Sequence, residues 1–301
     1  MKIGVVGAGK WGSALKDALS LKSSVCIWSK TPRDGQVSID EVLTSEYLLV
    51  AIASQHIDEW FKQNYIFKNT QKLLIASKGI DKQNGLFLNH ILSKYAPEEN
   101  TIFLSGPSFA SEVAKKLPTA LVLSCKSEQN AKEWSTLFPT FIKTYISDDV
   151  IGAEVGGAYK NVIAIAAGIC EGLQLGQNAR AALITRGLAE MTRFGLSFGA
   201  NIQSFLGLGG VGDLLLTATS QTSRNYRVGL ALSHGKTLQE ALIEIKETAE
   251  GVDTAFAIDK ICGEKNLYAP IAKEVTLILN GKNPKESISA LLSSSNKNEF
   301  Y

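Results

Sequence analysis

The first half of the chain alternates short apolar runs with segments of helical spacing. Leu15, Ala18 and Leu19 recur at the spacing of one helix face, which predicts a helix over residues 11–21. Short apolar strands that alternate with helices predict a parallel, doubly wound sheet whose connections are right-handed crossovers. The runs that we expect to form its strands are residues 2–6, 25–28, 47–52, 72–76, 101–104 and 119–123.

The pattern changes near residue 148, and no convincing strand run follows. Ile184, Leu188 and Met191 mark one helical stripe, and residues 227–246 and 253–262 also have helical periodicity. We therefore expect an α/β protein in which an N-terminal Rossmann-type domain with a doubly wound sheet precedes a C-terminal all-helical domain. The expected bounds are residues 1–147 and 148–301.

Composition fits a soluble globular protein and changes the picture only by exclusion. The 301 residues are 45% hydrophobic and 20% charged, and the formal net charge is +2. Basic residues form no run, so we expect no nucleic-acid partner. Cys26, Cys125, Cys170 and Cys262 lie far apart without a CxxC pair, so we expect reduced thiols and no metal centre.

The sequence predicts neither secretion nor membrane insertion. The N-terminus lacks the apolar core and the cleavage site of a signal peptide. The longest apolar run, near residues 162–170, is too short to cross a bilayer. We expect a cytoplasmic protein.

A glycine-rich turn at residues 7–12, GAGKWG, connects the first predicted strand to the first predicted helix. This G-x-G-x-x-G pattern is weak alone, but here it has the strand, helix and second strand that a dinucleotide site requires. Gly7 permits the tight turn, Gly9 lets the backbone approach a pyrophosphate, and Gly12 allows close packing of helix on strand. The helix N-terminus then offers free N–H groups to the phosphates. The alternative is a turn that is merely tight.

The tip of the second strand normally indicates whether the cofactor is NAD or NADP, because an acid there binds the ribose 2′-hydroxyl of NAD. No acid follows Trp28 directly, although Asp34 is near. Lys30 and Arg33 can balance the 2′-phosphate of NADP. We therefore favour NADP slightly over NAD; the alternative is that both cations are solvated loop charges.

Lys160 is the only charge in the helix-like stretch of residues 157–170. On a helix it shares a face with Ile163, Ala164 and Ala167, and a lysine on an apolar face is costly unless it has a role there. Because desolvation lowers the pKa of a buried lysine, such a group can exchange a proton with a reacting alcohol near neutral pH. The alternative is a lysine whose aliphatic stem is buried while its ammonium group reaches water.

Two further features of the second half favour a small anion. Ser223-Arg224-Asn225 opens a helix-like segment, where a serine and a fork-shaped guanidinium can hold a phosphate. Asp213, in a glycine-rich segment, can pair with Lys160 or contact a substrate hydroxyl. The alternative for Ser223-Arg224-Asn225 is an ordinary capped helix, and the alternative for Asp213 is a helix N-cap.

Two features of the first half point to the same ligand. Lys78 follows the fourth predicted strand, and the turn at residues 105–108 follows the fifth. Both therefore lie at the carboxyl edge of the sheet, where doubly wound folds bind ligands. The alternatives are a loop lysine and an ordinary turn.

These stretches closely resemble the NAD(P)-dependent glycerol-3-phosphate dehydrogenases of the bacterial biosynthetic type. The resemblance implies reversible conversion of glycerone phosphate to sn-glycerol 3-phosphate for phospholipid biosynthesis, by an enzyme that forms a homodimer. The matching blocks follow in the right order over nearly the full length, at residues 7–12, 77–80, 104–110, 154–162, 209–213, 223–225 and 250–252.

The resemblance, together with the glycine turn and the strand tip, assigns roles to individual residues. Lys160 is the implied proton donor or acceptor, and no metal ligand is expected. The expected substrate-binding residues are Lys78, Gly106, Ser108, Lys160, Asp213, Ser223, Arg224 and Asn225. The expected cofactor-binding residues are Gly7, Gly9, Lys10, Trp11, Gly12, Lys30, Lys78, Ala110, Arg224 and Glu250.

The sequence departs from the family pattern at two places. Two alternative functions also stay open. Lys10 stands where a small residue is usual, and the segment at residues 29–45 is short. A β-hydroxyacid or sugar-acid dehydrogenase of similar architecture would act on a carboxylate substrate. A non-catalytic dinucleotide-sensing protein would bind the cofactor without turnover.

Overall fold

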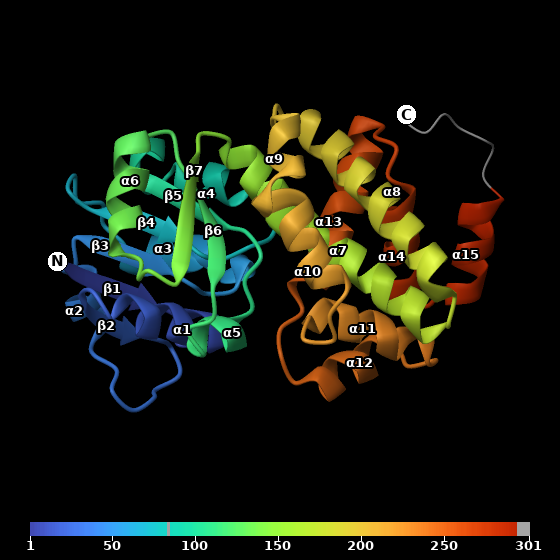
Figure 1. The fold of residues 1–301 in the computed structure, drawn as a ribbon, viewed down its shortest axis with the longest axis horizontal. Helices are drawn as coiled ribbons and strands as arrows, with labels where there is room; N and C mark the ends of the chain where they lie inside the picture. The colour runs from blue at the N-terminus through green and yellow to red at the C-terminus, as the bar shows by residue number, and fades with distance from the viewer. Residues whose placement is uncertain (83–84, 294–301) are drawn as a thin grey trace. The chain divides into compact units, whose positions relative to one another are not determined.

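The chain folds into two compact units (Figure 1). The computed structural model describes residues 1–82 and 85–293. Unit 1 contains Met1–Lys78 and Leu86–Glu154, and unit 2 contains Gly79–Gly85 and the chain from Val155 onward. The chain therefore enters unit 2 briefly after Lys78, returns to unit 1, and passes into unit 2 again within one long helix.

Unit 1 is built on a seven-stranded sheet with the order β2-β1-β3-β4-β5-β6-β7. The strands from β2 to β5 are parallel, as expected for a doubly wound sheet. The order reverses direction between β1 and β3, which is where such sheets bind ligands. The strands are β1 (Lys2–Val6), β2 (Ser24–Trp28), β3 (Tyr47–Val50), β4 (Lys72–Ile75), β5 (Thr101–Ser105), β6 (Thr119–Ser124) and β7 (Ile142–Ser147).

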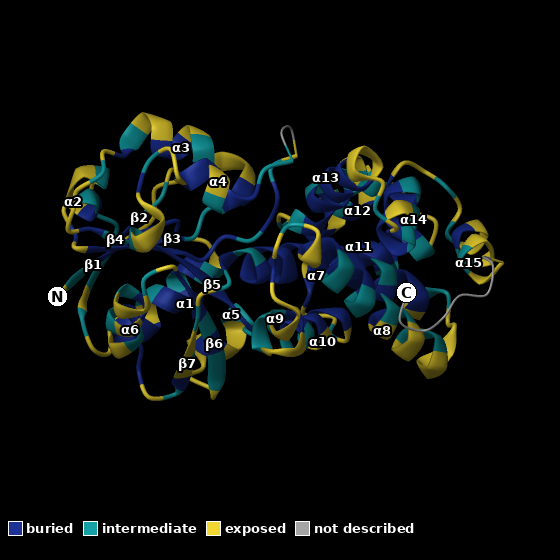
Figure 2. Ribbon diagram, turned by 90° about the horizontal axis from the view of Figure 1, so that it is seen from above, coloured by how far each residue is buried: buried dark blue, intermediate teal, exposed yellow. Residues whose placement is uncertain are grey.

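Helices cover both faces of this sheet (Figure 2). Leu49 and Leu74 pack into the core beneath α1, α5 and α6, whereas Leu48 and Leu73 pack into the core beneath α2, α3 and α4. Burial on both sides explains why the strands are continuously apolar. The covering helices are α1 (Lys10–Leu19), α2 (Ile39–Leu43), α3 (Ile57–Asn64), α4 (Leu88–Leu92), α5 (Ala110–Ala114) and α6 (Glu128–Leu137).

The prediction of an all-parallel sheet is wrong at one pair, and one strand was not predicted. β6 runs antiparallel to β5, because the connection at residues 106–118 stays at the carboxyl edge and makes no crossover. β7 pairs only with β6, so most of its side chains are partly or fully exposed. Lys143 and Thr144 interrupt its apolar pattern, so the hydrophobic pattern of the sequence does not predict this strand.

The described part of unit 2 from Val155 onward contains helices and no strand. α7 (Val150–Gly172) is long and apolar enough to cross a membrane, but 94% of its apolar window is buried, as in a core helix (Figure 2). The other α-helices are α8 (Gly176–Leu196), α9 (Ile202–Leu206), α10 (Asp213–Ala218), α11 (Arg224–Ser233), α12 (Leu238–Ile245), α13 (Glu250–Lys265), α14 (Pro270–Leu279) and α15 (Pro284–Leu292).

Glycines let the backbone of α7 approach that of α11. A Cβ at Gly168 would lie 2.0 Å from the Tyr226 carbonyl oxygen. A Cβ at Gly229 would lie 1.9 Å from the Ile165 carbonyl oxygen. The two helices therefore cross backbone against backbone, and a side chain at either glycine would force them apart.

The periodic stretch at residues 227–246 forms two helices rather than one. α11 ends at Ser233, and Gly235 has a φ of +84°, a conformation that favours glycine. Thr237 then begins α12 with a capping box, in which its hydroxyl accepts from the Glu240 N–H and the Glu240 carboxylate accepts from the Thr237 N–H.

Candidate functional site

The turn at residues 7–12 has a different requirement at each of its three glycines. Gly7 has a φ of +105°, and its N–H donates to the Trp28 carbonyl oxygen at 2.8 Å, which ties the turn to the tip of β2. A Cβ at Gly12 would lie 1.9 Å from the Gly7 carbonyl oxygen, so a side chain there would push α1 away from the strand. A Cβ at Gly9 would meet no described atom within 4 Å. The fold itself does not require glycine at position 9, whereas a bound pyrophosphate does.

The N-terminus of α1 is suited to an anion. Its N-cap residue, Gly9, has no side chain to cap the helix, and residues 10–13 of the first turn include no acid. First-turn N–H groups and the helix dipole then favour a phosphate, so these residues fit a dinucleotide cofactor. Lys10 is exposed in this turn, and Trp11 is half-buried against the core beneath α1.

The other expected residues of unit 1 follow the carboxyl ends of β4 and β5 or begin the next helix. Lys78 is half-buried just after β4, and Gly106 follows β5 directly with a φ of +107°. Ser108 Oγ donates to the Gly106 carbonyl oxygen at 3.1 Å. Ala110 begins α5, which packs on α1. Because β1, β4 and β5 are parallel members of one sheet, their carboxyl ends share one edge.

The segment after β2 is short and accessible. Lys30, Arg33 and Asp34 are all exposed in it. Two cations and one acid therefore face solvent between β2 and α2.

Lys160 is buried in unit 2 and paired. Its Nζ donates to Asp213 Oδ1 at 2.5 Å and to Thr217 Oγ1 at 3.0 Å. The side chains of Lys160 and Asp213 are only 8% and 1% exposed. Burying an ion pair carries a desolvation penalty, so such a pair indicates a functional role more than a source of stability. The expected lysine on an apolar face is thus also an ion-paired lysine.

Two local features bring α10 to Lys160. Asp213 and Thr217 are four residues apart, so they lie on one face of α10. Gly156 precedes Lys160 by one helical turn on α7, and a Cβ there would lie 2.4 Å from the Gly209 carbonyl oxygen. The close approach of the glycine-rich segment at Gly156 therefore positions the start of α10 beside the lysine.

The expected anion-binding residues, Ser223, Arg224 and Asn225, lie at the start of α11. Ser223 caps the helix, with its Oγ accepting a hydrogen bond from a backbone N–H of the first turn at 3.3 Å. Arg224 is exposed, whereas Asn225 is buried, and its Oδ1 accepts from the Gly251 N–H at 3.0 Å. This bond fixes the first turn of α11 beside the first turn of α13, which Glu250 begins.

Thr217 and Gly251 contact expected site residues, although neither is among the residues predicted from the sequence. The spacing of Thr217 from Asp213 was a readable signal. The Gly251 N–H bonds the expected residue Asn225, and a Cβ on Gly251 would lie 2.9 Å from the carbonyl oxygen of Asn161, the residue after Lys160. Unit 2 thereby brings the start of α13 close to α7 beside Lys160.

Metal chemistry has no obvious ligand set in the described part of the chain, where no group of three His, Cys, Asp or Glu side chains is suited to a metal ion. The cysteines are free, and Cys125, Cys170 and Cys262 are buried. The reactive groups that the site does offer are an ammonium, a carboxylate and a hydroxyl.

Glu154 is a buried acid at the end of unit 1, within the first turns of α7. Its Oε1 accepts from the Asn89 N–H at 3.1 Å, and Oε2 has no hydrogen-bond partner among the described residues. Burial raises the pKa of Glu154 to about 8, although hydrogen bonds from the Asn89 and Leu88 N–H groups oppose the change. The carboxyl is therefore largely neutral at pH 7.

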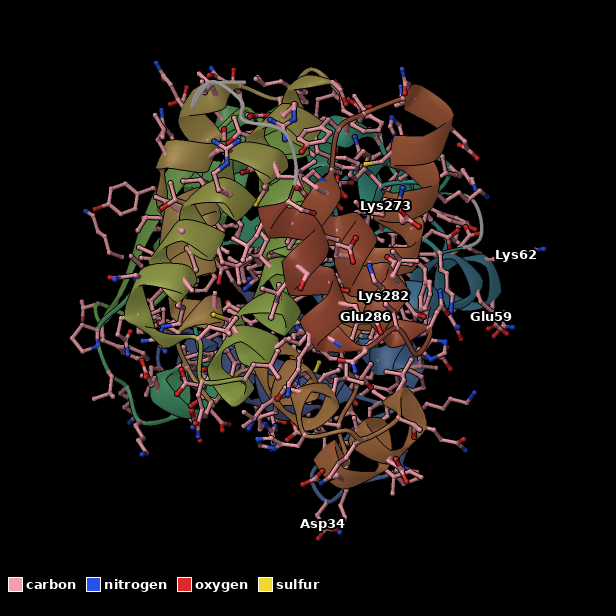
Figure 3. All side chains as sticks on the ribbon, turned by 90° about the vertical axis from the view of Figure 1, so that its right-hand side faces the viewer. Asp34, Glu59, Lys62, Lys273, Lys282 and Glu286 are labelled. Atoms are coloured by element: carbon pink, nitrogen blue, oxygen red, sulfur yellow. The ribbon has the colours of Figure 1, made fainter. Side chains whose placement is uncertain are left out.

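We expect the stability contribution of Glu154 to fall as the pH rises from about 4.5 to about 8, because the unfolded carboxyl loses its proton first. Glu154→Gln mimics the neutral acid, so it should raise the Tm at pH 9 by about 5 °C and change the Tm at pH 4 little. Thermal unfolding measures both. Glu59→Gln, at an exposed acid of α3, is the matched control (Figure 3). If the Tm of Glu154→Gln and the Tm of the parent depended on pH in the same way, the raised pKa of Glu154 would be contradicted.

Sequence comparison relates the chain to known enzymes over most of its length. The family described as NAD-dependent glycerol-3-phosphate dehydrogenase matches in two parts. Its N-terminal part matches residues 34–131, and its C-terminal part matches residues 149–289. Together the two matches span most of both units.

Individual relatives agree with this assignment. The glycerol-3-phosphate dehydrogenase [NAD(P)+] of Sulfurimonas denitrificans is 54% identical, over 97% of this chain and 99% of that protein. The enzyme of the same name from Nitratiruptor sp. is 55% identical, over 97% of this chain and 98% of that protein. Among solved structures, glycerol-3-phosphate dehydrogenase from Coxiella burnetii has a TM-score of 0.89 at 31% identity, covering 97% of this chain and 99% of that one.

Proposed function

Because the chain belongs to the NAD-dependent glycerol-3-phosphate dehydrogenase family, we propose that it reversibly interconverts glycerone phosphate and sn-glycerol 3-phosphate with NAD(P). The observation that carries the proposal is the buried pair of Lys160 and Asp213, with Nζ and Oδ1 2.5 Å apart. The full-length similarity favours this reaction over a carboxylate-specific dehydrogenase and over a non-catalytic sensor.

Lys160 is the proton donor or acceptor of the reaction. During reduction its ammonium donates a proton to the C2 oxygen of the substrate, and during oxidation its amine takes that proton back. The bound nicotinamide cofactor supplies or accepts the hydride at C2. Asp213 and Thr217 hold Nζ in place, and the carboxylate balances the ammonium charge inside the buried site.

The substrate phosphate binds at the start of α11, where the Arg224 guanidinium is exposed and Ser223 caps the helix. Binding energy from this remote group orients C2 for reaction. The whole substrate-binding set is Lys78, Gly106, Ser108, Lys160, Asp213, Ser223, Arg224 and Asn225.

The open space beside Gly9 and the uncapped start of α1 support a dinucleotide pyrophosphate at that turn. We assign residues 1–147 to a dinucleotide-binding domain and residues 148–301 to a substrate-binding and catalytic domain. The cofactor-binding set is Gly7, Gly9, Lys10, Trp11, Gly12, Lys30, Lys78, Ala110, Arg224 and Glu250.

The family resemblance also supports a cellular setting. We place the protein in the cytoplasm as a homodimer, where it supplies glycerol 3-phosphate for phospholipid biosynthesis.

Arg224→Ala should raise the KM for glycerone phosphate about 100-fold with a smaller change in kcat, because a charge-assisted, two-pronged contact to the phosphate is lost. The same variant should discriminate poorly between glycerone phosphate and dihydroxyacetone, which lacks the phosphate. Steady-state kinetics with both substrates measures this. Arg227→Ala is the matched control, since Arg227 lies on the same helix and pairs with Glu247 at 3.4 Å. Equal KM changes in the two variants would refute the assignment.

A further inference from the structure

One side chain, Gln36, closes the segment that follows β2 on itself. Its Oε1 accepts a hydrogen bond from the Ser29 N–H at 3.2 Å. Its Nε2 donates to Ser29 Oγ at 2.9 Å and to the Thr31 carbonyl oxygen at 3.4 Å. Ser29 Oγ in turn donates to the Thr31 carbonyl oxygen at 2.7 Å. The amide of Gln36 thus contacts both the N–H and the hydroxyl of the first residue beyond the strand.

This closed segment is fixed to the cofactor side of the sheet. The Val37 N–H donates to the Ile27 carbonyl oxygen at 3.1 Å, so the returning chain lies against β2. The Gly7 N–H donates to the Trp28 carbonyl oxygen at 2.8 Å, so the glycine turn holds the same strand end. In a doubly wound dinucleotide-binding sheet, this strand tip contacts the 2′ position of the adenosine ribose.

The charges of the segment suit a 2′-phosphate better than a 2′-hydroxyl. An NAD-selective tip carries a carboxylate, whereas here Ser29 is bonded to the uncharged amide of Gln36. Lys30 and Arg33 are exposed within the closed segment. Asp34, the one acid of residues 29–36, is exposed and projects away from the ribbon (Figure 3).

We infer that Gln36 is the positioning residue that sets the cofactor preference of the proposed reaction. It keeps the tip of β2 free of negative charge, and it holds the short segment in the form that presents Lys30 and Arg33 to the 2′-phosphate of NADP. A carboxylate at position 36 would still accept hydrogen bonds from Ser29, but it would repel a 2′-phosphate and attract a 2′-hydroxyl. The inference rests on the proposed function, because it concerns the cofactor of that reaction.

Direct binding of NADPH and NADH to the full-length protein, followed by nicotinamide fluorescence, tests this role. The parent should bind NADPH more tightly than NADH. Gln36→Glu should lower that preference at least about tenfold, because the added carboxylate repels the 2′-phosphate and competes with it for the Lys30 and Arg33 cations. Gln36→Met keeps the side-chain size without the hydrogen bonds, so it should lower the preference by a smaller factor. Gln63→Glu adds the same charge at an exposed position of α3 and should leave the preference unchanged.

Two further results separate the inference from a structural role. The double variant Lys30→Ala, Arg33→Ala should weaken NADPH binding by a much larger factor than NADH binding. If Gln36→Glu weakens both cofactors by the same factor, Gln36 only supports the fold and the inference is overturned. A parent that reduces glycerone phosphate but binds both cofactors equally overturns the inference alone, whereas a parent that binds neither cofactor contradicts the proposed function.

Discussion

Lys160→Ala should lower kcat for glycerone phosphate reduction at least about 1,000-fold, because the proton donor to the C2 oxygen is lost. The Kd of the cofactor should change little, since the cofactor contacts that we assign do not include this amine. Lys160 Nζ lies 2.5 Å from Asp213 Oδ1 and 3.0 Å from Thr217 Oγ1, so the amine has a defined position from which to transfer a proton. Stopped-flow or steady-state reduction assays measure the loss.

The fold of this variant needs its own control, because removing Lys160 leaves the Asp213 carboxylate buried and unpaired. Breaking a buried pair in this way costs about 3–5 kcal/mol of stability. The double variant Lys160→Met, Asp213→Asn replaces both charges with neutral groups of similar size, so it should regain much of the lost Tm without regaining activity. Turnover near that of the parent in either variant, with normal cofactor binding, would refute the assignment of Lys160.

Gly9→Ala should weaken cofactor binding about tenfold or more while leaving the Tm close to that of the parent. A Cβ at Gly9 meets no described atom within 4 Å, so the fold tolerates it, whereas a pyrophosphate at the turn does not. Gly12→Ala should instead lower both the Tm and the cofactor affinity, because its Cβ would lie 1.9 Å from the Gly7 carbonyl oxygen. Thermal unfolding and direct binding of NADPH separate the two effects.

Gly263→Ala is the matched control for both glycine variants. Gly263 lies within α13, and a Cβ there also meets no described atom within 4 Å. Alanine in a helix interior should leave cofactor binding unchanged and raise stability by about 0.5–1 kcal/mol. Cofactor binding by Gly9→Ala that matches this control would rule out a pyrophosphate against the glycine turn.

The sequence predicts those parts of the fold that local patterns encode. The strands near Val5, Leu49 and Leu74 are continuously apolar because helices cover both faces of the sheet. The turn around Gly7 and the helix start at Ser223 are equally local, since a single backbone conformation or a single cap defines each.

Features that depend on distant contacts were not predictable in the same way. β7 is defined by its pairing with β6, and nothing in the apolar content of its residues shows that pairing. The burial of Lys160 was readable, but its contact with Thr217 depends on the approach that Gly156 allows between α7 and the segment before α10. Gln36 has no motif of its own, and only the folded segment shows that its amide bonds Ser29.

Buried acids show the same limit. Glu190 of α8 accepts hydrogen bonds from the Ile271 and Ala272 N–H groups, at 3.0 and 2.9 Å, and from the Tyr159 hydroxyl at 2.8 Å. The acid thereby caps α14 from another helix, and no local sequence pattern predicts that contact. Burial raises its pKa, although these hydrogen bonds favour the carboxylate.

The most direct test of the central claim is the rate of glycerone phosphate reduction by the purified protein, followed as loss of reduced cofactor and measured separately with NADPH and NADH. The proposed function predicts reduction that saturates with glycerone phosphate and is much weaker with dihydroxyacetone, and the role inferred for Gln36 adds a higher kcat/KM with NADPH. Oxidation of neither cofactor in the presence of glycerone phosphate, by a folded protein that binds NADPH, would contradict it.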